Sequence, residues 1–257
     1  MKLGVAPPAE QLTPAFPLAE TTRPHEVQGG GLPPHGDDMK ILLLGATGMV
    51  GQGVLRECLI ASDVQRVTTL GRSATGQQHA SLDELTHANL FDLTSIEATL
   101  TGYDACFFCL GVSSAGMSEQ EYTVVTHDLT LSVAQTLARR NPSMTFVYVS
   151  GMGTYNTEHG RSMWARVKGR TENALLRLPF KAAYMFRPGA ILPMHGVRSK
   201  TALYRAAYVV LTPLYPLIKR LSPNAVTTSE QVGRAMLQVA RYGYPNPVLE
   251  TADINAL

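Results

Sequence analysis

Three glycines spaced three residues apart follow a short apolar run near position 40. The run is Lys40–Leu44, and the glycines are Gly45, Gly48 and Gly51. A continuous apolar stretch is typical of a buried parallel strand, and the glycines permit a tight turn into a helix. A turn of this kind directs backbone N–H groups and a helix N-terminus at a bound pyrophosphate. The spacing therefore predicts a dinucleotide-binding turn.

The context of the glycines carries this prediction, because their spacing departs from the usual G-x-G-x-x-G pattern. A helical pattern continues over Val50–Ile60, and a second strand is expected at Arg66–Leu70. A plain strand–turn–helix, with glycines that serve only close packing, is the alternative. The strand–loop–helix–strand context favours nucleotide binding, with Thr47 and Met49 supplying N–H groups of the loop and the helix start.

The residues after the second strand indicate which dinucleotide is favoured. NAD sites usually carry an acidic residue there, which binds the ribose hydroxyls. Here Leu70 is followed by Gly71, Arg72 and Ser73, while Asp63 lies at the other end of the strand. A guanidinium suits a 2′-phosphate, and Ser73 adds a hydroxyl donor. A solvated surface arginine is the alternative, but the missing acid favours NADP(H) over NAD(H).

Composition limits the class of protein. The chain has 257 residues, 45% of them hydrophobic, and a net charge of +2, which suits one α/β domain and gives no case for nucleic-acid binding. Its three cysteines cannot all pair, so we expect a reducing, cytoplasmic location. Cys106 and Cys109 have C-x-x-C spacing, but an odd offset in a strand puts them on opposite faces. We therefore expect structural thiols and no metal site.

Strands and helices alternate along the chain as far as residue 187. Further strands are expected at 85–88, 104–111, 144–150 and 182–187, and helices at 94–100, 118–139 and 161–178. This order predicts a Rossmann-type α/β fold, a doubly wound parallel sheet that binds its ligand at the carboxyl ends of the strands.

The two ends of the chain break this pattern. Residues 1–38 are rich in proline and glycine, so we expect a disordered extension before a folded unit at 39–257. Residues 188–257 are expected to form a small, mostly helical C-terminal lobe over the substrate site, with a capping box at Thr228–Gln231. Within it, 203–221 is apolar with flanking cations. Burial over the substrate pocket is favoured there, and contact with a membrane surface or another subunit is the alternative.

These motifs together resemble the short-chain dehydrogenase/reductase superfamily, especially its atypical and extended branch of epimerase/dehydratase-like and NmrA-like proteins. The resemblance covers residues 39 to about 245 and includes the glycine turn. It implies cofactor contacts outside that turn. Asp92 and Leu93 would border the adenine, Leu110 and Gly111 would pass beneath the ribose, and the turn formed by Arg187, Pro188 and Gly189 would lie beside the nicotinamide.

The same resemblance implies an active site with one departure. Oxidoreductases of the superfamily use a serine and a Tyr-x-x-x-Lys motif, whose positions hold Ser150, Trp164 and Lys168 here. An indole N–H is a donor only and cannot transfer a proton as a phenol does. Tyr155 and His159, in the preceding loop, are alternative acids. If neither acts, Lys168 only holds the ribose.

Two functions therefore follow from the sequence. The first is an NADP(H)-dependent oxidoreductase, or an epimerase/dehydratase-like enzyme, acting on a small molecule through Ser150, Lys168 and Tyr155. The second is a non-catalytic NADP(H)-binding regulator or interaction protein, which Trp164 favours.

Overall fold

The computed structural model describes residues 39–196 and 224–257. The predicted extension at 1–38 and the apolar segment 203–221 lie outside these ranges. The described residues belong to one compact unit, Asp37–Leu257.

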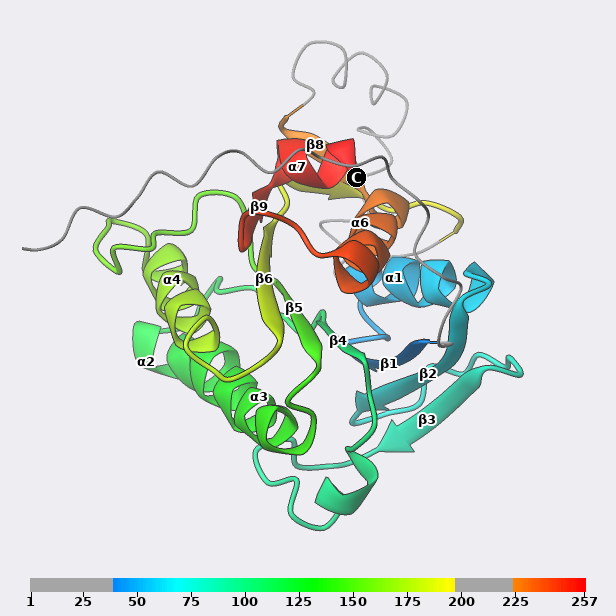
Figure 1. Ribbon diagram of the computed structural model, residues 1–257. Helices are drawn as coiled ribbons and strands as arrows, with labels where there is room; N and C mark the ends of the chain where they lie inside the picture. Colours follow the sequence, from blue (N-terminus) through cyan, green and yellow to red (C-terminus); the bar gives the residue numbers. More distant parts are fainter. Residues whose placement is uncertain (1–38, 197–223) are drawn as a thin grey trace, which may run out of the picture. The chain divides into compact units, whose positions relative to one another are not determined.

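A seven-stranded parallel sheet forms the centre of the fold (Figure 1). Its strand order is β3-β2-β1-β4-β5-β6-β9. The bounds are β1 Met39–Leu44, β2 Val64–Gly71, β3 Leu82–Thr86, β4 Ala105–Phe108, β5 Thr145–Val149, β6 Ala182–Arg187 and β9 Val248–Glu250. The order reverses between β1 and β4, where ligands bind in open sheets of this kind. The predicted Rossmann-type fold is confirmed.

Helices cover both faces of the sheet (Figure 1). The helices α1 (Met49–Ile60) and α6 (Ser229–Tyr242) pack on one face, and α3 (Leu129–Arg140) and α4 (Met163–Leu175) pack on the other. Alternate residues of β1 enter the two cores: Ile41 in the first, for example, and Leu42 in the second. Because both faces of the strand are buried, its sequence is apolar without alternation.

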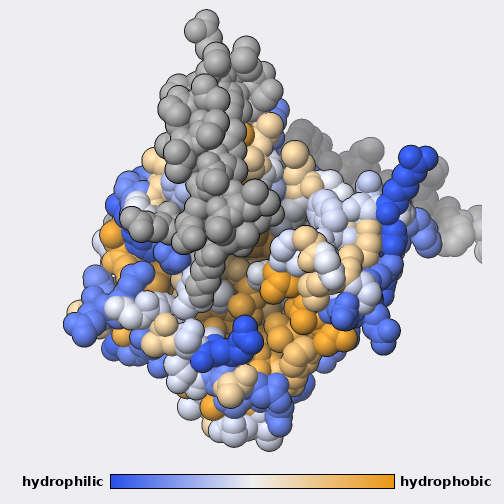
Figure 2. Space-filling model, turned by 180° about the vertical axis from the view of Figure 1, so that it is seen from behind, coloured by the Kyte–Doolittle hydropathy of each residue, from blue (hydrophilic) through white to orange (hydrophobic). Residues whose placement is uncertain are grey.

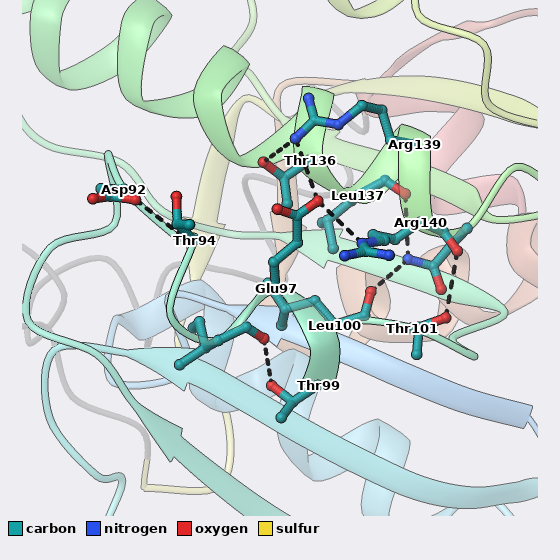
Figure 3. Close-up of polar contacts among 12 residues, drawn as sticks. Asp92, Thr94, Glu97, Thr99, Leu100, Thr101, Thr136, Leu137, Arg139 and Arg140 are labelled. Carbon is teal, nitrogen blue, oxygen red and sulfur yellow. Dashed lines mark hydrogen bonds and ion pairs between the residues drawn. The ribbon is translucent and has the colours of Figure 1, made fainter.

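Two elements differ from the sequence prediction on the chain between β2 and β4. The third strand runs over Leu82–Thr86 and begins three residues earlier than expected. It has few apolar residues, so pairing with β2 determines its position and the apolar pattern does not reveal it. The expected helix at 94–100 is only a 3-10 turn, η1 (Glu97–Thr99). Figure 3 shows Glu97 of this turn joined to Arg139 and Arg140 at the end of α3.

The predicted helix at 118–139 is interrupted. It consists of α2 (Glu119–Thr123), a π-helical segment η2 (Val124–Asp128) and α3. Ser118 begins it with a capping box that includes Glu121. Apolar periodicity predicts the length of such a helix but not a change in its hydrogen-bonding pattern.

The described part of 188–257 adds strand β9 to the main sheet and packs α6 against one of its faces. A parallel pair, β7 (Ala190–Leu192) with β8 (Val226–Thr228), precedes α6, and α7 (Thr251–Ala256) follows β9. Thr228 caps α6 by accepting from the Gln231 N–H at 3.0 Å, but the Gln231 side chain donates to the Ile254 carbonyl at 2.8 Å, so only half of the predicted capping box forms. Strand β9 was not predicted. Among the described helices, none is long and apolar enough to cross a membrane.

We predict that Gly51→Ala lowers the free energy of unfolding by about 2 kcal/mol, because overpacking of a closely packed contact costs on this order. A methyl group at Gly51 would collide with the carbonyl group of Gly45. Urea unfolding of purified protein measures the change. Gly111→Ala is the matched control, since a methyl group there meets no atom within 4 Å. Equal stability of the two variants would contradict the packing role of Gly51.

Candidate functional site

A cleft of about 120 Å³ lies at the carboxyl ends of β1 and β2. It is lined by the glycine turn after β1, the end of β2, the loop after β2 and two leucines: Gly45, Ala46, Thr47, Thr69, Leu70, Gly71, Arg72, Ser73, Thr75, Leu90 and Leu110. The structure thus brings together the glycine turn and the loop that contains Arg72, which the sequence separates by 20 residues or more.

The turn at Gly45 has the geometry that a phosphate site requires. Gly45 has a φ of 81°, and its carbonyl group accepts from the Gly48 N–H at 2.9 Å. A side chain at Gly45 would approach the backbone of Cys109 to 2.6 Å, so only glycine fits here. Helix α1 begins after Gly48 without a side-chain cap. The N–H groups of its first turn are therefore available to an anion.

Arg72 adds a positive charge to the cleft, beside the partial positive charge at the N-terminus of α1. Its side chain is exposed and, within the described ranges, makes no hydrogen bond or ion pair. None of the described residues that line the cleft is acidic. Thr75 and Leu90 also line it and were missed by sequence reasoning. Thr75 had a usable signal, since it lies in the same loop as Arg72.

The segment expected at the adenine contributes a different residue from those predicted. Leu90 and Leu93 are both buried in the second core, and of the two Leu90 also lines the cleft. The Asp92 carboxylate accepts from the Thr94 N–H at 3.0 Å (Figure 3). Hydrogen bonds from Thr94 lower the pKa of Asp92. The side chains of Asp92 and Leu93 thus shape this loop, and Leu90 faces the cleft.

Ser150 follows β5 and belongs to a short chain of hydroxyl groups. Its Oγ lies 3.1 Å from Oγ1 of Thr154, which donates to the Gly151 carbonyl at 2.7 Å. Because Thr154 uses its only proton in that bond, Ser150 donates to Thr154. Ser150 and Thr154 are both buried. For Ser150 to donate to a substrate, this hydrogen bond must first break.

Lys168 reaches the same strand end from α4. Its Nζ donates to the carbonyl groups of Val149 at 3.3 Å and Ser150 at 3.1 Å, and lies 5.3 Å from the centre of the Tyr148 ring. Burial lowers the pKa of Lys168 to about 8, against an opposing effect of Glu172. The structure therefore brings the Lys168 ammonium group to the backbone of Ser150.

The aromatic residue at the tyrosine position of the motif packs over the loop after β5. Trp164 lies one helical turn before Lys168, and methyl groups built at Gly151 and Gly153 would lie 3.8 and 3.9 Å from its ring. Methyl groups at these distances would make ordinary van der Waals contacts, so the indole lies against this loop without depending on glycine at either position. Trp164 is half-buried, so part of its ring is open to a ligand.

The two alternative acids lie elsewhere in that loop. Tyr155 donates its N–H to the Ala165 carbonyl at 3.2 Å, and its ring packs against Gly160. His159 is exposed. No contact in the described part of the chain joins either ring to Ser150. Whether either side chain acts as the acid therefore stays a prediction.

The turn after β6 is held by a buried arginine. Nε of Arg187 donates to Glu172 at 3.1 Å and one terminal nitrogen to Glu250 at 3.1 Å, while the other binds Glu172 and Asn156. Four of the five N–H donors of the guanidinium are thus used in tying α4, the loop after β5 and β9 to β6. The backbone at Arg187 and Pro188 is what this turn offers to a ligand, and the Pro188 carbonyl accepts from Met152 at 3.0 Å.

Apolar side chains are exposed after the ends of two strands, β4 and β5. The face opposite to the view of Figure 1 is hollowed in its middle, where apolar residues gather (Figure 2). Val112 and Met152, which follow β4 and β5, are 52% and 50% exposed. Leu110 lines the cleft, and Gly111 after it is open to solvent. Apolar side chains at strand ends suit an apolar ligand.

We predict that the stability advantage of the wild-type protein over Lys168→Met rises between pH 8 and 10.5. In this window the unfolded chain holds a proton on the lysine that the folded protein lacks, so folding becomes more favourable as pH rises. The expected increase is about 2 kcal/mol, measured by urea unfolding. A pH-independent difference between the two proteins would contradict a lowered pKa at Lys168.

Comparison with known proteins identifies relatives of the chain. Protein FMP52, mitochondrial, of Eremothecium gossypii is 30% identical over 156 residues, which cover 60% of this chain and 67% of the relative. The protein of that name in Candida albicans is 24% identical over 214 residues, covering 80% and 89%. Protein HTATIP2 of Rattus norvegicus is 25% identical over 154 residues, covering 59% and 62%.

These relatives correct one expectation. A cytoplasmic location was expected from the unpaired cysteines, and it is wrong, because the FMP52 relatives are named mitochondrial proteins. Cys58, Cys106 and Cys109 are free, with Cys106 and Cys109 packed against opposite cores, as predicted. Free thiols report a reducing environment, and this does not identify a compartment.

Solved structures share the fold. The enzyme WbmF of Bordetella bronchiseptica, in complex with NAD+, superposes with a TM-score of 0.61 at 15% identity, covering 86% of this chain and 77% of WbmF. The PhqB reductase domain of Penicillium fellutanum gives 0.61 at 16% identity, covering 85% and 68%. The sequence model of the NAD dependent epimerase/dehydratase family matches residues 41–174, which include the glycine turn, Ser150 and Lys168. The chain therefore belongs to this family of the short-chain dehydrogenase/reductase superfamily.

Proposed function

We propose that the protein is an NADP(H)-dependent oxidoreductase that reduces small conjugated carbonyl compounds. The observation that carries the cofactor assignment is the cleft that joins the Gly45 turn to Arg72, without an acidic residue among its described lining. WbmF, whose structure contains NAD+, supports a nicotinamide cofactor in this fold. Arg72 in place of an acid supports the 2′-phosphorylated form.

The described residues fit the parts of the cofactor in order. Gly45, Gly48 and Gly51, with the N–H groups of Thr47 and Met49, would hold the pyrophosphate. Arg72 and Ser73 would bind the 2′-phosphate. The remaining contacts would come from Leu90 and the loop of Asp92 and Leu93 at the adenine, Leu110 and Gly111 beneath the ribose, Lys168 at the nicotinamide ribose, and the Arg187–Pro188 turn at the nicotinamide.

Trp164 determines which reaction this site can support. The bound cofactor would supply a hydride, and reduction of a simple ketone also needs a proton donor, because the alkoxide product is about as strongly basic as hydroxide. Neither the indole of Trp164 nor the Ser150 hydroxyl, which donates to Thr154, meets that need. Tyr155 would serve as the acid only if its ring left Gly160.

A conjugated acceptor such as a quinone avoids this requirement. Hydride addition gives a hydroquinone anion, a phenolate of pKa about 10, which takes its proton from water. The indole ring of Trp164 and the exposed Val112 and Met152 offer surface for a flat apolar molecule. Ser150 would orient the substrate by exchanging its hydrogen bond to Thr154 for one to a quinone oxygen, and Lys168 would hold the cofactor.

A non-catalytic NADP(H)-binding regulator is the second candidate function. Trp164 favours it, because this residue replaces the proton donor of the motif while the cofactor cleft is formed. Both candidates predict cofactor binding, and only the first predicts turnover.

We predict that Arg72→Glu weakens NADPH binding by at least about tenfold and changes NADH binding less than about threefold, since it removes a charged hydrogen bond to the 2′-phosphate. Calorimetric titration of each cofactor measures both constants. Arg177→Glu makes the same change of charge at an exposed position beyond the end of α4 and should leave both unchanged. Equal losses for the two cofactors in Arg72→Glu would count against NADP(H).

We predict that the wild-type protein oxidises NADPH with 9,10-phenanthrenequinone and not with cyclohexanone, followed by nicotinamide absorbance. Trp164→Tyr places a phenol one helical turn before Lys168 and should add cyclohexanone reduction. Trp164→Phe, which lacks the hydroxyl, should not. NADPH binding without quinone turnover would support the regulator, and cyclohexanone turnover by the wild type would contradict the role given to Trp164.

A further inference from the structure

Among the described residues, the side chain of Glu84 attaches the loop after β2, residues 72–77, to the sheet. Thr75 is half-buried, whereas the loop residues around it are exposed. One carboxylate oxygen of Glu84 accepts from the Thr75 N–H at 2.5 Å and also from the Thr75 hydroxyl. Oγ1 of Thr75 in turn accepts from the Gln77 N–H at 3.1 Å. Glu84 is therefore the point at which this loop is fastened.

Glu84 lies on the edge strand β3, on a defined face of the sheet. It is opposite Thr69 of β2 in the parallel register, and Thr69 lines the cleft. Leu82 packs against the first core and Leu85 against the second. Since side chains alternate along a strand, Glu84 shares the face of Leu82, and Asp83 points to the opposite face.

The residues fastened in this way are those that face the cleft. Arg72, Ser73 and Thr75 line it, and Arg72 has no polar contact of its own in the described part of the chain. A long exposed arginine loses side-chain entropy when it binds a ligand. If the loop backbone is already fixed, the total conformational entropy lost on binding is smaller. The loop backbone beneath Arg72 depends on the Glu84–Thr75 contact.

We propose that Glu84 is a positioning residue for cofactor specificity: by holding Thr75 it fixes the loop so that Arg72 and Ser73 can bind the 2′-phosphate of the adenosine. This inference rests on the proposed NADP(H) preference. Glu84 itself does not contact the ligand. Its role depends on hydrogen-bond acceptance, because the negative charge of a nearby carboxylate by itself opposes phosphate binding.

These two effects of Glu84 separate in a pair of variants. Glu84→Gln keeps an oxygen acceptor for Thr75 and removes the charge, whereas Glu84→Ala removes both. The probes are adenosine 2′,5′-bisphosphate and AMP, which differ at the 2′-phosphate and need no turnover. Titration calorimetry measures each dissociation constant, and thermal unfolding checks that every variant is folded.

We expect Glu84→Ala to bind adenosine 2′,5′-bisphosphate about tenfold more weakly, with AMP affinity changed less than about twofold. Glu84→Gln should retain or exceed the wild-type affinity for the bisphosphate. Asp83→Asn is the matched control: Asp83 is adjacent in β3, exposed, and paired with Arg66 at 3.3 Å. It should change neither affinity.

Three results would overturn the inference. Tighter bisphosphate binding in Glu84→Ala as well as in Glu84→Gln would mean that the carboxylate acts only by repulsion. An equal loss for both probes would mean a general structural role. A wild-type preference for the bisphosphate that survives in Glu84→Ala would remove the role of Glu84 and leave the proposed cofactor intact, whereas a wild type without preference would overturn the cofactor proposal itself.

Discussion

The close approach of three backbone segments at the carboxyl end of β1 is the constraint on which the site depends. Gly45 lies against the backbone of Cys109 after β4, and Gly51 of α1 lies against Gly45. No side chain fits between these segments, so the first turn of the helix stands directly over the strand end. Because the sheet is parallel, the ends of β2, β5 and β6 meet at the same edge, and every predicted site residue on a strand end follows from that arrangement.

A buried ion pair organises the other half of the site. Glu172 of α4 has no exposed surface, and its negative charge is paired with Arg187 at the end of β6. A buried charge without a partner is strongly unfavourable, so this pair fixes α4 relative to β6. Lys168 lies one turn before Glu172 on the same helix and thereby reaches the end of β5. Arg187, which the family resemblance places at the nicotinamide, thus supports the site through its ion pair with Glu172.

The parts of the site that were predicted are those encoded by local spacing. The glycine turn, Arg72 after β2, and the Ser150–Lys168 pair all follow from counting residues between elements, and the structure brings them to one edge. Leu90, Thr154 and Glu84 were not predicted. The part that each one has in this region depends on its contacts with another segment or with another position of the same loop, and residue spacing does not encode such contacts. Strand β9 and the π-helical segment were missed for a similar reason, because the first is only three residues long and the second preserves helical periodicity.

The sequence by itself determined the fold class, the family, the position of the glycine turn and the presence of Trp164 at the tyrosine position of the motif. These are properties of residue type and spacing along the chain, which local steric and hydrophobic rules translate directly. The tertiary structure decided which polar groups are already occupied. The Ser150 hydroxyl donates to Thr154, and the Arg187 guanidinium is paired with Glu172 and Glu250. The Arg72 side chain lines the cleft and has no polar partner among the described residues. Hydrogen-bond partners are set by packing between distant segments, and this is why spacing alone does not reveal them.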